Sequence, residues 1–275
     1  MSRLSKDSGL LERFLQVVGV SREELSVEAL TELVTAYMMR VPFENISKLY
    51  HKMKNGRHDL PTLDTYLDGI ERYHFGGTCY SNNYYLHLLL KHLGYDVMLC
   101  GADMVDPDAH LVNIVSLDGR EFLVDAGYAA PFLKPLPRDL REDYVITLGR
   151  DRYVLKPKDN HGRSRVELHR DGQLKHGYTV KPIPRQIGHF GRVIEDSYRP
   201  SATFMNALLL VRLYPNRSVV IHNLSVIESE GTDYHIHRLA SKDELPAVVE
   251  KHFRIPHAIV SEAVGELGEF GDAWD

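Results

Sequence analysis

A cysteine that follows two glycines and begins a helical pattern is the feature of this sequence best suited to chemistry. Gly76 and Gly77 let the backbone turn sharply and approach a ligand closely. Thr78 is expected to cap a helix over residues 80–93. Cys79 would then lie in the first turn of that helix, where partial positive charge favours the reactive thiolate form. The pattern predicts that Cys79 is a nucleophile.

A histidine and an aspartate on two neighbouring strand patterns are the predicted partners of this thiol. His110 begins and Asp125 ends a pair of apolar runs, and Asp118-Gly119 between them is typical of a tight hairpin turn. In such a hairpin the numbers of paired residues sum to 237, so His110 and Asp125 are diagonal neighbours on one face. Diagonal Cα atoms lie roughly 7–8 Å apart, which allows a hydrogen bond between the imidazole and the carboxylate.

Together the three side chains form a candidate Cys-His-Asp triad. The imidazole would take the proton of the thiol, and the carboxylate would fix the imidazole tautomer and stabilise the cation. Backbone N–H groups around Cys79 would hold the oxyanion of a tetrahedral intermediate. Each residue alone has a plainer interpretation, because buried cysteines are usually inert, His110 is one of fifteen histidines, and Asp125 could be a turn residue. Sequence spacing does not by itself bring Cys79 to His110.

The composition is that of an ordinary globular protein. Of the 275 residues, 43% are hydrophobic and 26% are charged, which is enough apolar material for a sizeable core. The formal net charge of −5 argues against a general nucleic-acid binder or a binder of acidic membranes. The first seven residues have no apolar signal core, no window approaches eighteen apolar residues, and only two cysteines occur. A cytoplasmic protein is expected.

Metal binding is not expected from the histidines. His235 and His237 would share one face of a strand, but no cysteine or acid cluster at metal-ligand spacing accompanies them.

The hydrophobic pattern divides the chain into three parts of an α+β protein. Residues 1–94 read as a helical bundle, with helix-capping signals at Ser21, Ser26 and Thr62. Residues 95–197 are short, β-rich segments broken by turns, which favours an antiparallel β-barrel. Residues 198–275 combine strands with a helix that Ser241 can cap.

Four segments of the chain resemble motifs of the arylamine N-acetyltransferase family. Their order and spacing fit along most of the chain, and the match is looser after Tyr198. The segments are Val41-Pro42-Phe43-Glu44-Asn45-Ile46, similar to the family's Val-Pro-Phe-Glu-Asn-Leu; Gly76-Gly77-Thr78-Cys79-Tyr80 with Asn83, similar to Gly-Gly-x-Cys-Phe and the asparagine four places after the cysteine; His110-Leu111-Val112, similar to the segment with the family's histidine; and Leu123-Val124-Asp125-Ala126-Gly127-Tyr128, similar to Leu-Val-Asp-Val-Gly-Phe.

The resemblance implies a helical bundle, a β-barrel and a C-terminal α/β lid. It also implies a ping-pong reaction, in which acetyl-CoA is the co-substrate and no metal takes part. Acetyl-CoA would acylate Cys79, CoA would leave, and an aromatic amine or hydrazine would take the acetyl group. By this resemblance Cys79 is the nucleophile, His110 the base and Asp125 the orienting acid.

The same resemblance implies a cleft for CoA and the acceptor. Gly127 and Tyr128 in the loop after the aspartate, and Phe204 in the lid segment, would line it. The partners of the protein would be these small molecules.

The chain departs from the family pattern around the cysteine. The family usually has arginine before the two glycines and glutamate two places after the cysteine, where this chain has Phe75 and Ser81. Arg72 is a candidate substitute partner for Glu44. The family often has glycine at the position of Ala129.

Two other functions share the same sequence features. A cysteine hydrolase or transglutaminase-like enzyme uses the same Cys, His, Asp order, and acetylation of Cys79 by acetyl-CoA would distinguish it from an acyltransferase. A catalytically inactive CoA-binding or interaction module would have a Cys79 that iodoacetamide does not alkylate rapidly.

Overall fold

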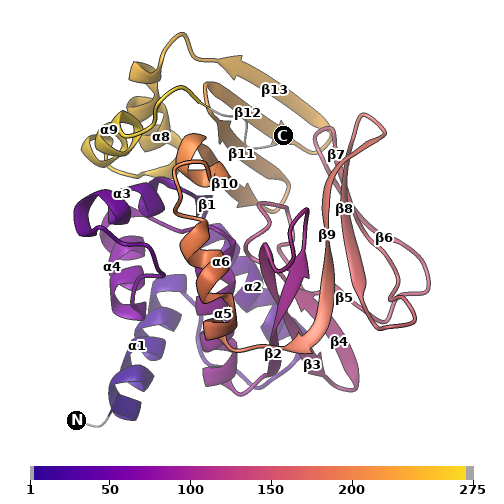
Figure 1. The fold of residues 1–275 in the computed structure, drawn as a ribbon. Coiled ribbons are helices and arrows are strands. Elements are labelled where there is room, and N and C mark those ends of the chain that lie inside the picture. Colours follow the sequence, from indigo (N-terminus) through magenta and orange to yellow (C-terminus); the bar gives the residue numbers. More distant parts are fainter. Residues whose placement is uncertain (1–2, 271–275) are drawn as a thin grey trace.

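Helices of the first part of the chain pack beside a curled sheet, and a second, smaller sheet lies at the end of the molecule that carries the last two helices (Figure 1). The computed structural model describes residues 3–270, and of residues 3–7 only the backbone. The N-terminal helices are α1 (Arg3–Val18), α2 (Val27–Arg40), α3 (Ile46–Asn55), α4 (Leu63–Tyr73) and α5 (Cys79–Leu93). The predicted helical bundle therefore forms, with α3 as an additional helix that the sequence pattern did not predict.

Two of the four caps predicted in this region form. The Ser26 hydroxyl accepts the backbone N–H of Ala29 at the start of α2, and Thr62 caps α4 in the same way. The prediction at Ser21 is wrong, because residues 19–25 form no helix. No apolar residue follows Ser21 until Leu25, so a helix there would have no face to bury.

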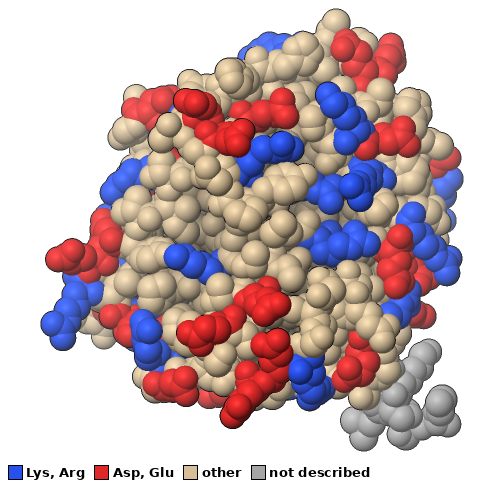
Figure 2. All heavy atoms as spheres, turned by 180° about the vertical axis from the view of Figure 1, so that it is seen from behind, with Lys and Arg blue, Asp and Glu red and all other residues tan. Residues whose placement is uncertain are grey.

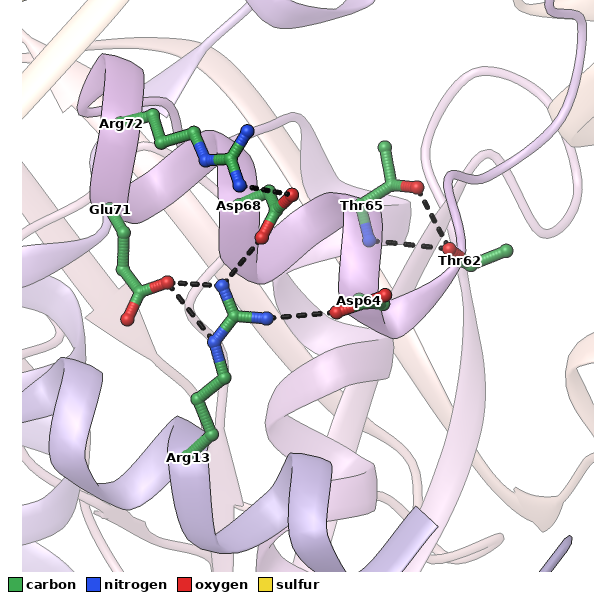
Figure 3. Close-up of polar contacts among 7 residues, drawn as sticks. All are labelled: Arg13, Thr62, Asp64, Thr65, Asp68, Glu71 and Arg72. Atoms are coloured by element: carbon green, nitrogen blue, oxygen red, sulfur yellow. Dashed lines mark hydrogen bonds and ion pairs between the residues drawn. The ribbon is translucent and has the colours of Figure 1, made fainter. Parts of the chain in front are cut away.

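An arginine on α1 ties this helix to α4 (Figure 3). The Arg13 guanidinium donates to Asp64 at 2.8 Å and to Asp68 at 2.6 Å, and it also pairs with Glu71. Glu71 and Asp68 hold the pKa of Arg13 above its ordinary value, chiefly through the hydrogen bond to Glu71. Because the Arg13 cation neutralises these three acids on α4, we expect the packing of α1 against α4 to depend on Arg13.

The curled sheet has eight strands, all antiparallel. Its order is β5-β4-β3-β2-β9-β8-β7-β6, so the predicted barrel is an open half-barrel with β5 and β6 at its edges. The strands are β2 (Asp96–Asp103), β3 (His110–Leu117), β4 (Arg120–Val124), β5 (Leu136–Pro137), β6 (Tyr144–Leu148), β7 (Asp151–Leu155), β8 (Ser164–Arg170) and β9 (Gln173–Pro184). Asn113 pairs with Val124, which confirms the predicted β3–β4 register.

A second sheet of five strands begins with a segment from the N-terminal part of the chain. Its order is β1-β10-β11-β12-β13, and Phe43 of β1 pairs with Val211 of β10. The strands are β1 (Phe43–Glu44), β10 (Leu209–Tyr214), β11 (Arg217–His222), β12 (Ser225–Glu230) and β13 (Asp233–Arg238). The chain between the sheets forms a short 3-10 helix, η1 (Ile187–Phe190), with α6 (Gly191–Asp196) and α7 (Thr203–Asn206).

The C-terminal helices pack against this second sheet. The predicted capping box forms, with the Ser241 hydroxyl and the Glu244 carboxylate bonded to each other's backbone. The elements are η2 (Lys242–Glu244), α8 (Leu245–Phe253) and α9 (His257–Gly265). Phe253 and Val260 are fully buried in the core that these helices share with β10 and β11.

The surface carries both charge signs. Figure 2 shows Lys and Arg side chains interspersed with Asp and Glu over the face opposite that of Figure 1. No helix within residues 3–270 combines the length and apolarity needed to cross a bilayer.

Replacing Arg13 by alanine is expected to destabilise the protein by about 1 kcal/mol, because three facing carboxylates lose their common cation. Urea unfolding at low and high salt measures the free energy of unfolding of the wild-type protein and of the variant. High salt should reduce the difference between the two values. Arg72→Ala is the matched control, since Arg72 also pairs with Asp68 but its side chain is 66% exposed, against 28% for Arg13. Equal destabilisation by the two variants would contradict the assigned role of Arg13.

Candidate active site

Cys79 is the first residue of α5 and is 8% exposed. The helix begins one residue earlier than the sequence predicts. Thr78 takes the N-cap position but its side chain makes no capping hydrogen bond, so that part of the prediction is wrong. The first N–H groups of an α-helix have no partner within the helix, and the Thr78 side chain does not cap them here. These N–H groups are available to a substrate oxygen.

The two glycines before Cys79 are needed for close backbone packing. A Cβ atom on Gly76 would collide with the backbone of Pro42. Across the same contact, the backbone N–H of Glu44 donates to the carbonyl of Gly77 at 3.1 Å. The Glu44 carboxylate accepts the N–H groups of Gly76 at 3.0 Å and of Ser47 at 2.8 Å. The segment from Pro42 to Ser47 therefore holds the loop in front of the cysteine.

One departure in this loop, Phe75, is accommodated by apolar packing. Phe75 is buried and packs against the rings of Tyr50 and Tyr73. Arg72 does not substitute as a partner of Glu44, because it lies on the exposed side of α4 and pairs with Asp68. Burial raises the pKa of Glu44, whose hydrogen bonds from backbone N–H groups lower it only partly.

His110 and Asp125 meet as the hairpin register predicts. The Nε2 atom of His110 lies 2.8 Å from Oδ2 of Asp125, and both residues are buried. With Nε2 bonded to the carboxylate, Nδ1 is the nitrogen left to face the thiol. Cys79 and His110 line the same cavity, and a hydrogen bond from Cys79 is among the causes that raise the pKa of His110.

Asn83 connects the cysteine helix to the hairpin. It lies one turn after Cys79 on α5, and its amide nitrogen donates to Oδ1 of Asp125 at 2.8 Å and to the carbonyl of Leu111 at 2.7 Å. Its amide oxygen accepts the N–H of Ala126 at 2.9 Å. These three bonds from one buried side chain fix where α5 lies relative to β3 and β4.

The electrostatic environment favours a charged imidazole beside a charged carboxylate. Burial alone would lower the pKa of His110, but the Asp125 charge and the hydrogen bonds to Asp125 and Cys79 raise it above its ordinary value. Burial alone would raise the pKa of Asp125, but His110 and the hydrogen bonds from Tyr178 and Asn83 hold it below its ordinary value. An imidazolium next to the sulfur stabilises a thiolate.

Tyr178 is a site residue that the sequence reasoning missed. Its hydroxyl donates to Oδ2 of Asp125 at 2.6 Å, and the ring contacts that of His110. Burial and the Asp125 charge raise the pKa of Tyr178, so the phenol keeps the proton that it donates. Tyr178 is on β9, and no local pattern shows that this strand lies within reach of Asp125.

A cavity of about 470 Å³ opens beside the triad. Cys79 and His110 line it, as do the three residues that sequence reasoning assigned to a cleft, which are Gly127, Tyr128 and Phe204. Gly127 allows this close approach, since a Cβ atom there would lie 2.6 Å from Cα of Cys79. A cavity of this size accepts a small aromatic molecule or the end of a larger one.

Ala129 lies at the wall of this cavity in a strained backbone conformation. Its φ angle of 61° is in the left-handed region, which a glycine adopts more readily than an alanine. Ala129 also lines a second cavity, of about 210 Å³, between the half-barrel and the second sheet.

The described residues offer no evident metal centre. Within residues 3–270 no group of three or more His, Cys, Asp or Glu side chains is placed to hold a metal ion. The arrangement beside the cavity is instead a thiol, an imidazole and a carboxylate in series, which is suited to attack on a carbonyl carbon.

Comparison with known proteins gives one consistent result. A family model described as N-acetyltransferase matches residues 26–260. Proansamycin X synthase of Amycolatopsis mediterranei is 26% identical over 88% of this chain and 95% of its own length. Arylamine N-acetyltransferase, pineal gland isozyme NAT-3, of Gallus gallus is 35% identical over 50% of this chain and 49% of its own length, so the chain matches about half of that relative.

Solved structures agree with the sequence relatives. The structure of Mycobacterium marinum arylamine N-acetyltransferase in complex with CoA superposes with a TM-score of 0.76 over 94% of this chain and 99% of that one, at 18% identity. This likeness shows the fold, while the family model covers well over half of the sequence. The chain belongs to the arylamine N-acetyltransferase family.

Proposed function

We propose that the protein transfers an acetyl group from acetyl-CoA to an aromatic amine or hydrazine through a thioester on Cys79. The observation that carries the proposal is that Cys79 and His110 line one substrate-sized cavity, with His110 hydrogen-bonded to the buried Asp125. Membership of the family supports acetyl-CoA as the donor, as does the complex of the Mycobacterium marinum enzyme with CoA.

In the first half of the reaction the Cys79 thiolate attacks the thioester carbonyl of acetyl-CoA. The bond between that carbon and the CoA sulfur breaks, and the CoA thiolate takes the proton of the His110 imidazolium. Uncapped N–H groups in the first turn of α5 stabilise the negative oxygen of the tetrahedral intermediate.

In the second half the acceptor nitrogen attacks the acetyl-cysteine. His110, now neutral, takes a proton from the nitrogen, and the bond between the acetyl carbon and the Cys79 sulfur breaks. The thiolate returns beside an imidazolium that Asp125 stabilises, which restores the starting state.

The cleft residues have a role in holding both substrates. Tyr128 and Phe204 present aromatic rings to the cavity next to Cys79. Stacking of the acceptor ring on such side chains contributes both binding and orientation. The partners of the protein in this proposal are small molecules, and a cytoplasmic location remains an expectation from the sequence.

Acylation of a single cysteine tests the thioester. Incubation with acetyl-CoA without acceptor should add one acetyl group to the intact protein, as measured by mass spectrometry. Cys79→Ser should abolish this and the transfer reaction. Cys100→Ser is the matched control and should keep both, because burial raises the pKa of Cys100 to about 12 and keeps it a thiol. Turnover by the Cys79 variant, or loss of acylation in the Cys100 variant only, would contradict the proposal.

The carboxylate of Asp125 is expected to control the imidazole. Asp125→Asn should lower kcat on the order of 10⁴-fold, because the amide favours the wrong tautomer.

Tyr178→Phe removes one hydrogen bond to a charged group and should lower kcat roughly 10-fold. Steady-state assays of CoA release across a pH series measure both changes in kcat. In the Tyr178 variant, the acidic limb of the pH profile of kcat should be shifted. An unchanged pH profile in that variant would contradict a role through Asp125.

A further inference from the structure

A lysine occupies an unfavourable position at the wall of the catalytic cavity. Lys48 is the third residue of α3, and its side chain is buried, with the residue only 7% exposed. Burial of an ammonium group is costly, and the first turn of a helix carries partial positive charge that repels a cation. Burial and the position in the first turn both disfavour the Lys48 charge, which suggests that this charge has a function.

The partners of this ammonium group carry no formal negative charge. Its Nζ atom donates to the carbonyl of Ser197 at 2.7 Å and to the hydroxyl of the same residue at 2.8 Å, and it lies 4.3 Å from the centre of the Tyr198 ring. In the described part of the chain no carboxylate forms an ion pair with Lys48. By contrast, the exposed Lys54 on the same helix pairs with Glu262 at 2.6 Å.

Lys48 lines the cavity that contains Cys79 and His110, and it also lines a smaller pocket of about 30 Å³ that contains neither of them. A charge on Cys79 is one of the causes that raise the pKa of Lys48. Two acids line the cavity. Asp196 is already paired with Arg199 at 2.7 Å, and Asp106 forms no ion pair with Lys48 in the described part of the chain. The ammonium group is therefore a cation without an ion-pair partner at the wall of the catalytic cavity.

We propose that Lys48 forms an anion subsite that binds a carboxylate of the substrate next to Cys79. This inference rests on the proposed acetyl-transfer chemistry and narrows its substrates. The phosphates of CoA are separated from its thioester by the whole pantetheine arm, so an anion near Cys79 belongs to the acyl group or to the acceptor. The two sources are an acyl-CoA whose acyl chain ends in a carboxylate and an aromatic amine that bears one.

Matched substrate pairs distinguish these sources. Malonyl-CoA is compared with acetyl-CoA using aniline as the acceptor, and 4-aminobenzoate is compared with aniline using acetyl-CoA as the donor. For the source that is correct, Lys48→Met should lower the ratio of kcat/KM between the carboxylated and the neutral substrate by about 10-fold, as expected for loss of a charged hydrogen bond. Lys48→Arg should keep part of that ratio.

The matched control is Lys52→Met. Lys52 lies one turn further along α3 and donates to the carbonyl of Tyr198 at 3.0 Å, so it tethers the same segment without lining the cavity. This variant should leave both ratios unchanged. Ratios that stay constant in Lys48→Met, or that fall equally in Lys52→Met, would overturn the subsite and make Lys48 a structural tether.

The pH dependence of the same ratio provides a second readout. Burial lowers the pKa of Lys48 to about 8, the charge on Cys79 raises it and Lys52 lowers it. The preference for the carboxylated substrate should therefore be lost as the pH rises through about 8. Other titratable groups also line the cavity, so Lys48→Met, which keeps all of them, is the reference for the pH profile; they are Cys79, Tyr80, Asp106, His110, Tyr128, His176 and Asp196, and Tyr198 lies against the ammonium group. A preference that falls with pH in the same way in Lys48→Met would contradict the assignment to Lys48.

A binding assay separates failure of this inference from failure of the proposed function. Benzoate should slow alkylation of Cys79 by iodoacetamide more than benzamide does in the wild-type protein, and equally in Lys48→Met. This assay needs no acetyl transfer. Equal protection by the two compounds in the wild-type protein would overturn the subsite, whether or not acetyl-CoA acylates Cys79.

Discussion

The site depends on one buried carboxylate that four hydrogen-bond donors surround. Asp125 accepts from His110 and Tyr178 on one oxygen, and from Asn83 and the backbone N–H of Gly127 on the other. A buried carboxylate without partners would be costly, so its charge requires the elements that supply these donors to converge. The helix with the nucleophile, the hairpin and β9 are thus held together by the same group that orients the imidazole.

The parts of the site that the sequence predicts are those set by local geometry. The Asp118-Gly119 turn fixes the register of β3 and β4, and alternation along the strands then places His110 and Asp125 on one face. The glycines before Cys79 likewise indicate close backbone packing, which the contact of Gly76 with Pro42 explains. In both cases the determining residues are neighbours in the sequence.

The parts that the sequence could not predict depend on contacts between distant segments. Tyr178 reaches Asp125 only because β9 pairs with β2 in the half-barrel, and strand order is not encoded in any local pattern. Lys48 belongs to α3, a helix that the hydrophobic pattern did not indicate, and its burial depends on Ser197. The Thr78 side chain had the right residue type for a cap, but the hydrogen bond does not form.

The short strand β1 joins the second sheet to the loop before the nucleophile. Phe43 pairs with Val211 of β10 on one side and forms a bridge to Gly77 on the other. The setting of Cys79 therefore includes residues that are synthesised long after it. In a nascent chain that has left the ribosome only as far as the half-barrel, β10 is absent, so β1 has no partner strand on that side and the loop before Cys79 is not yet attached to the second sheet.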